Sequence, residues 1–117
     1  MRVLVCGGRD FEDVRFLLKV LDRVHAKHYI RMLIHGDAKG ADRLGRDWAR
    51  SRNVPIETYP ADWRKDGKAA GPIRNQRMLA EGRPDAVVAF RGGNGTAHMV
   101  RIAQKAGIKI YDVRELS

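Results

Sequence analysis

The sequence predicts an α/β fold in which a sheet of about five mostly parallel strands lies between two layers of helices. Short apolar runs of strand length alternate along the whole chain with longer segments whose apolar residues recur at intervals of three and four. Three of the apolar runs also end in glycine-rich turns, which suit tight strand-to-helix connections. This alternation favours a three-layer, doubly wound sheet with helices on both faces and right-handed crossovers.

The first half of the chain predicts three strands and two helices. Residues 2–6 and 32–35 are apolar runs typical of strands buried on both faces, and residues 55–59 predict a third strand. A first amphipathic helix is expected from Phe11, where apolar residues begin to recur at helical spacing. A second helix is expected to end near Asn53. Its apolar stripe consists of Ala41, Leu44, Trp48 and Ala49.

The second half begins with residues 60–71, the longest segment without apolar periodicity, which predicts a loop of functional importance or high mobility. Pro72 fits the first turn of a third helix that runs to about Gly82. Residues 85–90 predict the fourth strand, and residues 109–111 the last one.

A fourth helix is expected between these last two strands. Asn94 is predicted to cap it, and Gly107 to end it. The residues expected to face inward are Ala97, Val100, Ala103 and Ala106.

Length and composition predict one domain over residues 1–117, because 117 residues is a common domain size. The single cysteine, Cys6, excludes an intramolecular disulfide, and no charged leader with a separate apolar segment precedes the first strand, so a cytoplasmic location is expected. No apolar run approaches the roughly 20 residues that span a bilayer, so no membrane partner is expected.

The formal net charge of +9 leaves three interpretations open. Basic residues are spread from Arg2 to Arg114 and are often interleaved with acidic ones, which favours solvated helix faces. The same charge is compatible with non-specific nucleic-acid binding through counterion release. It also suits the steering of a small anionic ligand toward a cleft.

Glycine-rich turns follow the first, second and fourth predicted strands, at residues 7–10, 36–42 and 91–96. In doubly wound sheets, ligands bind beyond the carboxyl ends of the strands, so these turns are expected to meet at one edge. Glycine lets the backbone approach a ligand, and a helix N-terminus beyond it attracts phosphate. The alternative is that tight turns need glycine for their geometry alone. Neither the dinucleotide fingerprint nor the P-loop pattern is present.

Four motifs occur in order along the chain: Gly-Gly-Arg-Asp at 7–10, His-Gly-Asp-Ala-Lys-Gly-Ala-Asp at 35–42, Gly-Pro-Ile-Arg-Asn-Gln-Arg-Met at 71–78 and Gly-Gly-Asn-Gly-Thr at 92–96. With these motifs the chain resembles the SLOG superfamily, and within it the small bacterial and phage group called YspA-like or cpYpsA-related. The resemblance implies a Rossmann-like fold and the binding or processing of a nucleotide-derived ligand, without a cofactor. It also implies a homodimer, to which Met78, Leu79 and Met99 are expected to contribute a shared face.

The superfamily includes the LOG phosphoribohydrolases and the DNA-processing protein DprA. By this resemblance Gly92, Gly93, Gly95 and Thr96 match the LOG phosphate loop. The LOG motif places a proline where this chain has Arg91 and a catalytic glutamate where it has Met99. A thioether cannot exchange protons, so cleavage of an N-glycosidic bond would need another carboxylate.

Candidate site residues follow from the motifs. The tentative catalytic carboxylates are Asp37 and Asp42, both of which are also good helix-start residues. Arg74 suits a bidentate contact with phosphate, and Trp63 either stacks on a base or packs under a lid. The candidate ligand- and phosphate-binding residues are Gly7, Gly8, Arg9, Asp10, Gly36, Asp37, Gly40, Arg74, Asn75, Arg91, Gly92, Gly93, Asn94, Gly95 and Thr96.

Three histidines are candidates for core or metal-binding residues. His35 ends a strand and is expected to be a hydrogen-bonded core residue. His25 and His28 have no further ligand in metal-binding spacing, so no metal is predicted. Three functions stay open: a protein that binds, senses or slowly processes a nucleotide-derived ligand, an N-glycosidase acting on nucleoside monophosphates, and a DprA-like nucleic-acid-binding protein.

Overall fold

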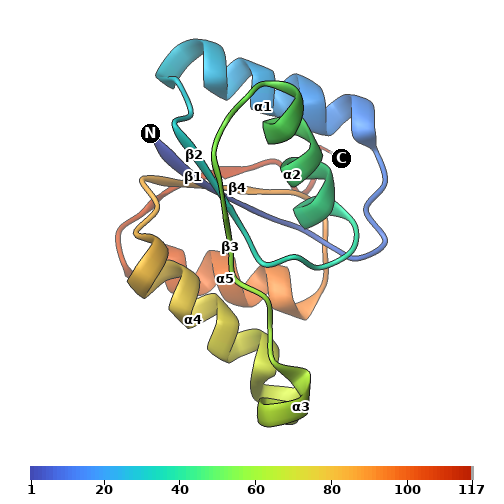
Figure 1. Ribbon diagram of the computed structural model, residues 1–117, viewed down its shortest axis with the longest axis vertical. Coiled ribbons are helices and arrows are strands. Elements are labelled where there is room, and N and C mark those ends of the chain that lie inside the picture. The colour runs from blue at the N-terminus through green and yellow to red at the C-terminus, as the bar shows by residue number, and fades with distance from the viewer. Residues whose placement is uncertain (117) are drawn as a thin grey trace.

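The computed structural model describes residues 1–116 and shows one five-stranded sheet with helices on both faces (Figure 1). The elements in chain order are β1 (Arg2–Cys6), α1 (Val14–His28), β2 (Met32–His35), α2 (Ala41–Ser51), β3 (Ile56–Thr58), α3 (Trp63–Asp66), the 3₁₀ turn η1 (Gly67–Ala69), α4 (Ala70–Gly82), β4 (Ala86–Ala89), α5 (Asn94–Lys105) and β5 (Lys109–Asp112). All strand pairs are parallel, in the order β3-β2-β1-β4-β5. The predicted α/β class and its parallel sheet are confirmed.

The two faces of the sheet are separated by the alternation of side chains along each strand. In β1, Val3 and Val5 pack with α1 and α2, whereas Leu4 and Cys6 pack with α4 and α5. All four are nearly inaccessible to solvent, which explains why β1 is a continuous apolar run rather than an alternating one. Cys6 therefore packs as a small buried hydrophobic residue.

The direction of the chain across the sheet reverses between β1 and β4. After β1 the chain continues outward to β2 and β3, then returns to the other side of β1 and adds β4 and β5. The loops after β1 and β4 therefore separate in opposite directions at the carboxyl edge, and this switch point is where such sheets bind ligands.

Residues 60–71 are not the loop that the sequence predicts. Asp62 accepts a hydrogen bond from the backbone N–H of Lys65 at 3.1 Å and thereby caps α3, which continues through η1 into α4. No residue of α3 or η1 is buried, so the segment has no apolar stripe by which its helical structure could be recognised. In Figure 1 α3 lies at the end of the molecule opposite α1.

Helix α5 differs from its prediction at its N-cap and at Ala106, whereas Gly107, with a φ angle of 74°, follows its last turn as predicted. Gly93 occupies the N-cap position, and the side chain of Asn94 makes no capping hydrogen bond. Ala106 is exposed because the helix has already ended, and the buried face of α5 consists of Thr96, Met99, Val100 and Ala103.

Two of the three residues predicted for the dimer face, Met78 and Met99, are wrong, whereas Leu79 is partly exposed. Met78 and Met99 are 2% and 0% exposed, and both belong to the core cluster between the sheet and α4 and α5. They cannot form a contact between two copies of the chain. No helix among residues 1–116 is both long and apolar enough to cross a membrane.

Candidate functional site

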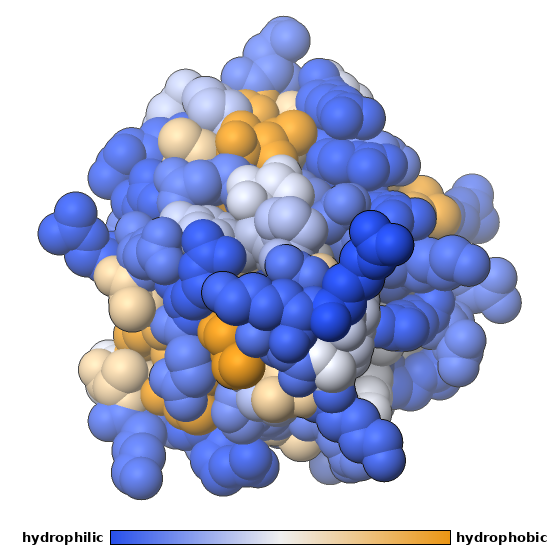
Figure 2. Space-filling view, turned by 60° about the horizontal axis from the view of Figure 1, so that its bottom comes forward, coloured by the Kyte–Doolittle hydropathy of each residue, from blue (hydrophilic) through white to orange (hydrophobic). Residues whose placement is uncertain are grey.

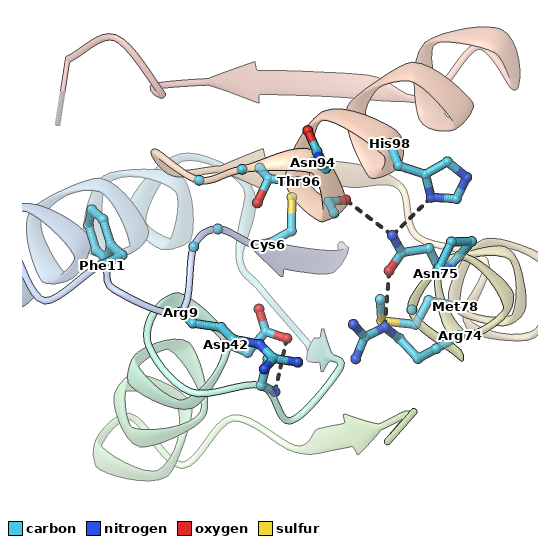
Figure 3. Close-up of a pocket in the computed structure, with 18 of the residues that line it drawn as sticks. Cys6, Arg9, Phe11, Asp42, Arg74, Asn75, Met78, Asn94, Thr96 and His98 are labelled. Atoms are coloured by element: carbon cyan, nitrogen blue, oxygen red, sulfur yellow. Dashed lines mark hydrogen bonds between the residues drawn. The ribbon is translucent and has the colours of Figure 1, made fainter. Parts of the chain in front are cut away.

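A cleft of about 810 Å³ opens at the carboxyl edge of the sheet, at the switch point between β1 and β4 (Figure 3). This volume lies within the range of pockets that bind small molecules. Its walls come from the loops after β1 and β4, the first turns of α4 and α5, and Trp63 on α3. The cleft therefore brings together segments from the whole length of the chain.

Most of the sequence-predicted site residues line this cleft. They are Gly7, Gly8, Arg9, Asp10, Asp42, Arg74, Asn75, Arg91, Gly92, Gly93, Asn94, Gly95 and Thr96. Gly36, Asp37 and Gly40 do not line it. All three belong to the turn after β2, of which only Ala38 reaches the cleft wall.

Sequence reasoning missed several residues of the cleft wall. They are Cys6, Phe11, Ala38, Lys68, Gly71, Pro72, Met78, His98 and Arg101. Lys68 lies in residues 60–71, the segment that the sequence predicts to be a loop. His98 and Arg101 follow Asn94 at intervals of four and three residues, so their helical spacing was a signal that could have placed them on the same face of α5.

The loops after β1 and β4 pack directly on each other. The backbone N–H of Gly8 donates to the carbonyl of Arg91 at 2.8 Å. A side chain at position 92 would clash with the Gly8 nitrogen at 2.6 Å and with the Thr96 hydroxyl. Gly8 and Gly92 are therefore explained by the close approach of the two loops, without any ligand.

Gly93 and Gly95 have no such explanation. A Cβ atom at either position would meet no other atom within 4 Å, and neither residue has a positive φ angle. Gly95 lies in the first turn of α5, where alanine would be the better helix former. The absence of side chains at these two positions instead leaves the N-terminus of α5 accessible from the cleft.

The N-terminus of α5 carries no side-chain cap among the described residues. The first N–H groups of a helix have no partner within the helix, and together with the helix dipole they attract anions. Asn94, Gly95 and Thr96 form this first turn and all line the cleft. The turn is thus open to a phosphate group.

Arg74 is held at the cleft wall by two hydrogen bonds. Its Nη1 donates to the carbonyl of Gly36 at 2.6 Å, and its Nε donates to Oδ1 of Asn75 at 3.0 Å. A side chain at position 36 would overlap the guanidinium, with Cζ at 2.7 Å, so glycine there allows Arg74 to keep this position. No hydrogen bond of Nη2 to another described residue is present, which leaves this nitrogen for a ligand.

Asn75 connects α4 to α5 and is only 4% exposed. Its Nδ2 donates to the carbonyl of Gly95 at 3.2 Å and to Nδ1 of His98 at 3.1 Å. The amide is thus occupied on both sides by the protein, which gives Asn75 a positioning role for Arg74 and for the first turn of α5. His98 accepts at Nδ1 and is neutral, in agreement with the lowering of its pKa by burial.

Asp42 is a buried carboxyl group at the base of the cleft (Figure 3). Its Oδ2 accepts hydrogen bonds from the N–H groups of Gly36 and Ala38, at 3.1 and 3.3 Å, and so fixes the turn after β2. Burial raises the pKa of Asp42 to about 6, although Arg74 and the two N–H groups act in the opposite direction. A carboxyl group with this pKa can exchange a proton near neutral pH.

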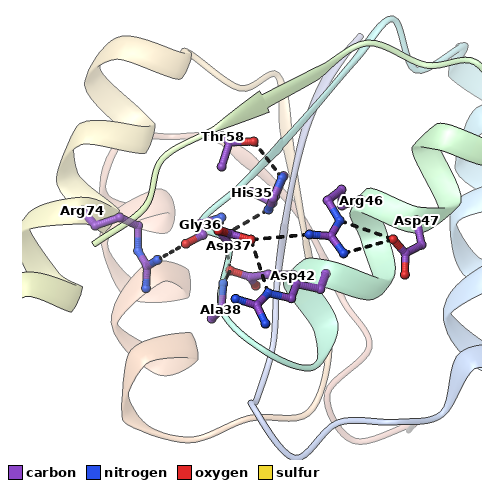
Figure 4. A network of polar contacts seen from close by, with 10 residues as sticks. His35, Gly36, Asp37, Ala38, Asp42, Arg46, Asp47, Thr58 and Arg74 are labelled. Carbon is purple, nitrogen blue, oxygen red and sulfur yellow. Dashed lines mark hydrogen bonds and ion pairs between the residues drawn. The ribbon is translucent and has the colours of Figure 1, made fainter. Parts of the chain in front are cut away.

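Asp37 faces away from the cleft (Figure 4). Its backbone has a φ angle of 59°, and its carboxylate lies 3.3 Å from Arg43 Nε and 3.7 Å from Arg46 Nη1 on α2. These two ion pairs with α2 therefore hold the Asp37 carboxylate on the side of the turn that faces away from the cleft. Of the two tentative catalytic carboxylates, only Asp42 lines the cleft.

His35 is the hydrogen-bonded core histidine that the sequence predicts. It is 0% exposed, and its Nδ1 accepts the N–H of Asp37 at 3.0 Å. The proton must then lie on Nε2, which donates to Thr58 Oγ1 at 3.0 Å (Figure 4). Burial lowers the pKa of His35 to about 4, so the neutral form persists at physiological pH.

The raised pKa of Asp42 predicts a pH dependence of stability. Because the pKa is about 6 in the folded protein and 3.8 ordinarily, proton binding favours the folded state. The stabilisation of the folded state by the protonated Asp42 carboxyl is complete below about pH 4 and is lost as the pH rises through 6. Between pH 4 and 8 we expect the free energy of unfolding of wild type to fall by on the order of 3 kcal/mol relative to Asp42→Asn.

Urea titrations of both proteins at several pH values measure this difference. The lowered pKa of His35 has the opposite effect on stability, because the free energy of unfolding decreases as the pH falls below 6.5. This effect is the same in both proteins, so it cancels in the difference between them. Parallel pH profiles for the two proteins would show that Asp42 ionises normally.

Cations outnumber acids around the cleft. The charged residues of its wall are Arg9, Asp10, Asp42, Lys68, Arg74, Arg91 and Arg101. Figure 2 shows that the face turned forward there is mainly hydrophilic, with apolar residues in small separate patches. The charge of the cleft suits an anionic small molecule better than an apolar one.

The model of the YspA, cpYpsA-related SLOG family matches residues 1–65, which is more than half of the chain. The chain belongs to this SLOG family. A further relative of this SLOG chain is the Gene 61 protein of Mycobacterium phage D29, which is 39% identical over 119 residues covering 95% of this chain and 94% of that protein. The resemblance predicted from the four motifs is confirmed.

Two solved structures share the fold of this SLOG protein. DNA processing protein A (DprA) from Streptococcus pneumoniae matches with a TM-score of 0.77 and 16% identity, over 95% of this chain and 49% of that one. The structural genomics target TM1055 matches with a TM-score of 0.70 and 19% identity, over 93% of this chain and 71% of that one. This chain therefore spans about half the length of the DprA structure.

The residue that the sequence comparison matches to the LOG glutamate, Met99, is not available to a ligand in this structure. Met99, at the position of the LOG glutamate, is fully buried in the core cluster with α4 and the sheet. It does not line the cleft. The carboxyl groups that line the cleft come instead from the loop after β1, as Asp10, and from the first turn of α2, as Asp42.

Proposed function

We propose that this SLOG protein binds a phosphate-bearing, nucleotide-derived small molecule in the cleft at the carboxyl ends of β1 and β4. The observation that carries this proposal is the open first turn of α5, with glycine at positions 93 and 95, where a Cβ would meet no other atom and φ is not positive. Phosphate would accept hydrogen bonds from the N–H groups of that turn and from Arg74 Nη2. The remaining cleft volume would accommodate the sugar and base.

The first experiment is a thermal-shift screen of the full chain. Its ligands are nucleoside mono-, di- and triphosphates, ADP-ribose, and cyclic nucleotides and dinucleotides. A ligand present at a hundred times its dissociation constant stabilises the native state by about 2.7 kcal/mol, which raises the melting temperature by several degrees in a domain of this size. We expect one nucleotide class to produce this shift.

Gly95→Ala and Thr96→Val make the screen specific to the α5 turn. Gly95→Ala should raise the melting temperature of the free protein slightly, because alanine favours the helix by about 0.5–1 kcal/mol, and yet reduce the ligand-induced shift. These opposite effects distinguish a binding role from a folding role. If both variants respond to ligand as wild type does, the phosphate does not bind at this turn.

A second candidate function is hydrolysis of an N-glycosidic bond, which the position and pKa of Asp42 favour. In this reaction the bond between the sugar C1′ and the base nitrogen breaks, and the base leaves with a proton from Asp42. Water supplies the oxygen that binds C1′, and the proton that this water loses returns to Asp42. The products of a nucleoside monophosphate are ribose 5-phosphate and the free base. Release of base by wild type but not by Asp42→Asn would support it, and equal release by both would exclude Asp42.

The DprA-like reading makes nucleic acid the partner. It predicts that DNA, rather than any free nucleotide, raises the melting temperature, and that the effect falls steeply with salt. A homodimer and a cytoplasmic location also stay predictions.

A further inference from the structure

Trp63 is an exposed aromatic residue at the mouth of the cleft. Its side chain is 50% exposed and lines the cleft, whereas the other tryptophan, Trp48, is 1% exposed in the core. Large aromatic surfaces are normally buried or used for binding. The hydrogen-bonded cap of Asp62 fixes the start of α3 and so holds the backbone of Trp63 in place.

Arg9 comes from the loop after β1 and faces this tryptophan. Its Cζ atom lies 5.4 Å from the centre of the Trp63 ring, a cation–π distance. Arg9 forms no ion pair within the described part of the chain, so the contact with Trp63 is the interaction that orients its guanidinium. Gly71 lies beside the edge of the same ring, where a Cβ would be 3.6 Å from Cη2.

Two planar π-surfaces therefore lie together on the wall of the cleft. Indole rings and guanidinium planes are the groups on which proteins stack nucleic-acid bases, since every base has a π-face. A phosphate has no such face, and a ribose offers only a small C–H surface, so either would gain less than a base from stacking on Trp63. The surface suits an aromatic base, whichever base it is.

We propose that Trp63 and Arg9 form a base-stacking subsite, so that the ligand of this cleft carries an intact nucleobase rather than being a sugar phosphate alone. This inference rests on the proposed function, which places the phosphate at the first turn of α5. The ligand then extends across the cleft from α5 to α3. Arg9 orients Trp63, and the base stacks on the exposed surface of the pair.

The test compares four nucleoside 5′-monophosphates, one for each common base, with ribose 5-phosphate and inorganic phosphate. Binding to the full chain is followed by thermal shift and by calorimetry. Stacking on an aromatic side chain strengthens binding by about tenfold or more. We expect at least one nucleotide to bind wild type about tenfold more tightly than ribose 5-phosphate does.

Trp63→Leu should remove this advantage and leave the affinity for ribose 5-phosphate unchanged, whereas Trp63→Phe should retain most of it. Fluorescence supplies an independent readout. The nucleotide should quench the emission of wild type but not that of Trp63→Phe, in which only the buried Trp48 remains. Because Trp63 is half exposed, both variants should fold, which circular dichroism would verify.

Different failures have different meanings. If nucleotide and ribose 5-phosphate bind wild type equally, or if Trp63→Leu weakens both to the same extent, the stacking subsite is refuted while phosphate binding stands. If none of the nucleotides, ribose 5-phosphate or phosphate binds, and no ligand of the thermal-shift screen binds either, the proposed function fails and the subsite fails with it.

Discussion

Replacing Gly40 with alanine is expected to destabilise the fold by at least about 3 kcal/mol, through combined backbone strain and overpacking. Gly40 precedes α2 with φ 81° and ψ −130°, a conformation that side chains rarely allow. A Cβ there would collide with the carbonyl oxygen of Gly8 and lie 2.8 Å from that of Arg9. Both obstacles are backbone atoms, which cannot move aside as a flexible side chain can. Chemical denaturation would measure the loss.

Gly107→Ala is the matched control. Gly107 also has a positive φ, 74°, but a Cβ at that position would meet no other atom within 4 Å. It should therefore cost only the backbone strain, about 1–2 kcal/mol. If the two substitutions cost the same, the packing of the turn after β2 against the loop after β1 contributes nothing to stability.

Arg74→Ala is expected to weaken ligand binding by about 10- to 150-fold, because a charge-assisted hydrogen bond contributes about 1.5–3 kcal/mol. Gly36 and Asn75 already hold two of the guanidinium nitrogens, so the third is presented to the cleft in a fixed direction. Arg74→Lys should not restore binding, since a single ammonium group cannot bond to these partners and to a phosphate in the same geometry. Calorimetry with the nucleotide identified by the screen measures both.

Arg77→Ala is the control on the same helix. Arg77 is exposed, pairs with Glu81 at 2.9 Å and does not line the cleft. The substitution Arg77→Ala removes the same charge from α4 as Arg74→Ala does. Because it breaks only an exposed ion pair outside the cleft, it should change the affinity for the ligand by less than about twofold. Equal effects of the two alanine variants would mean that overall charge, and not the position of Arg74, governs affinity.

The buried strands and amphipathic helices could be predicted from the sequence because their signals are local. Residues 3–6 are apolar throughout because both faces of β1 are covered there, and helices that pack on one face carry an apolar stripe. Helix α3 could not be predicted, since it buries no side chain and so has no stripe. Its cap residue, Asp62, is the one local signal of its start.

The candidate site could likewise be predicted from the sequence only in part. Glycine turns at strand ends predicted where the cleft lies, because parallel strands end at a common edge. They did not reveal which glycines serve packing and which leave open space. Gly92 and Gly93 are adjacent in sequence, yet a Cβ at Gly92 would collide with Gly8, whereas one at Gly93 meets nothing.

The sequence by itself determined the family, the parallel α/β fold and the edge of the sheet where the glycine turns meet, because these depend on residue order and periodicity. Only the tertiary structure decided that Asp42 faces the cleft while Asp37 pairs with α2, and that Trp63 meets Arg9. The physical reason is that the direction of a side chain in a turn depends on the backbone angles and on partners distant in sequence. Neither is recorded in the spacing of residues along the chain.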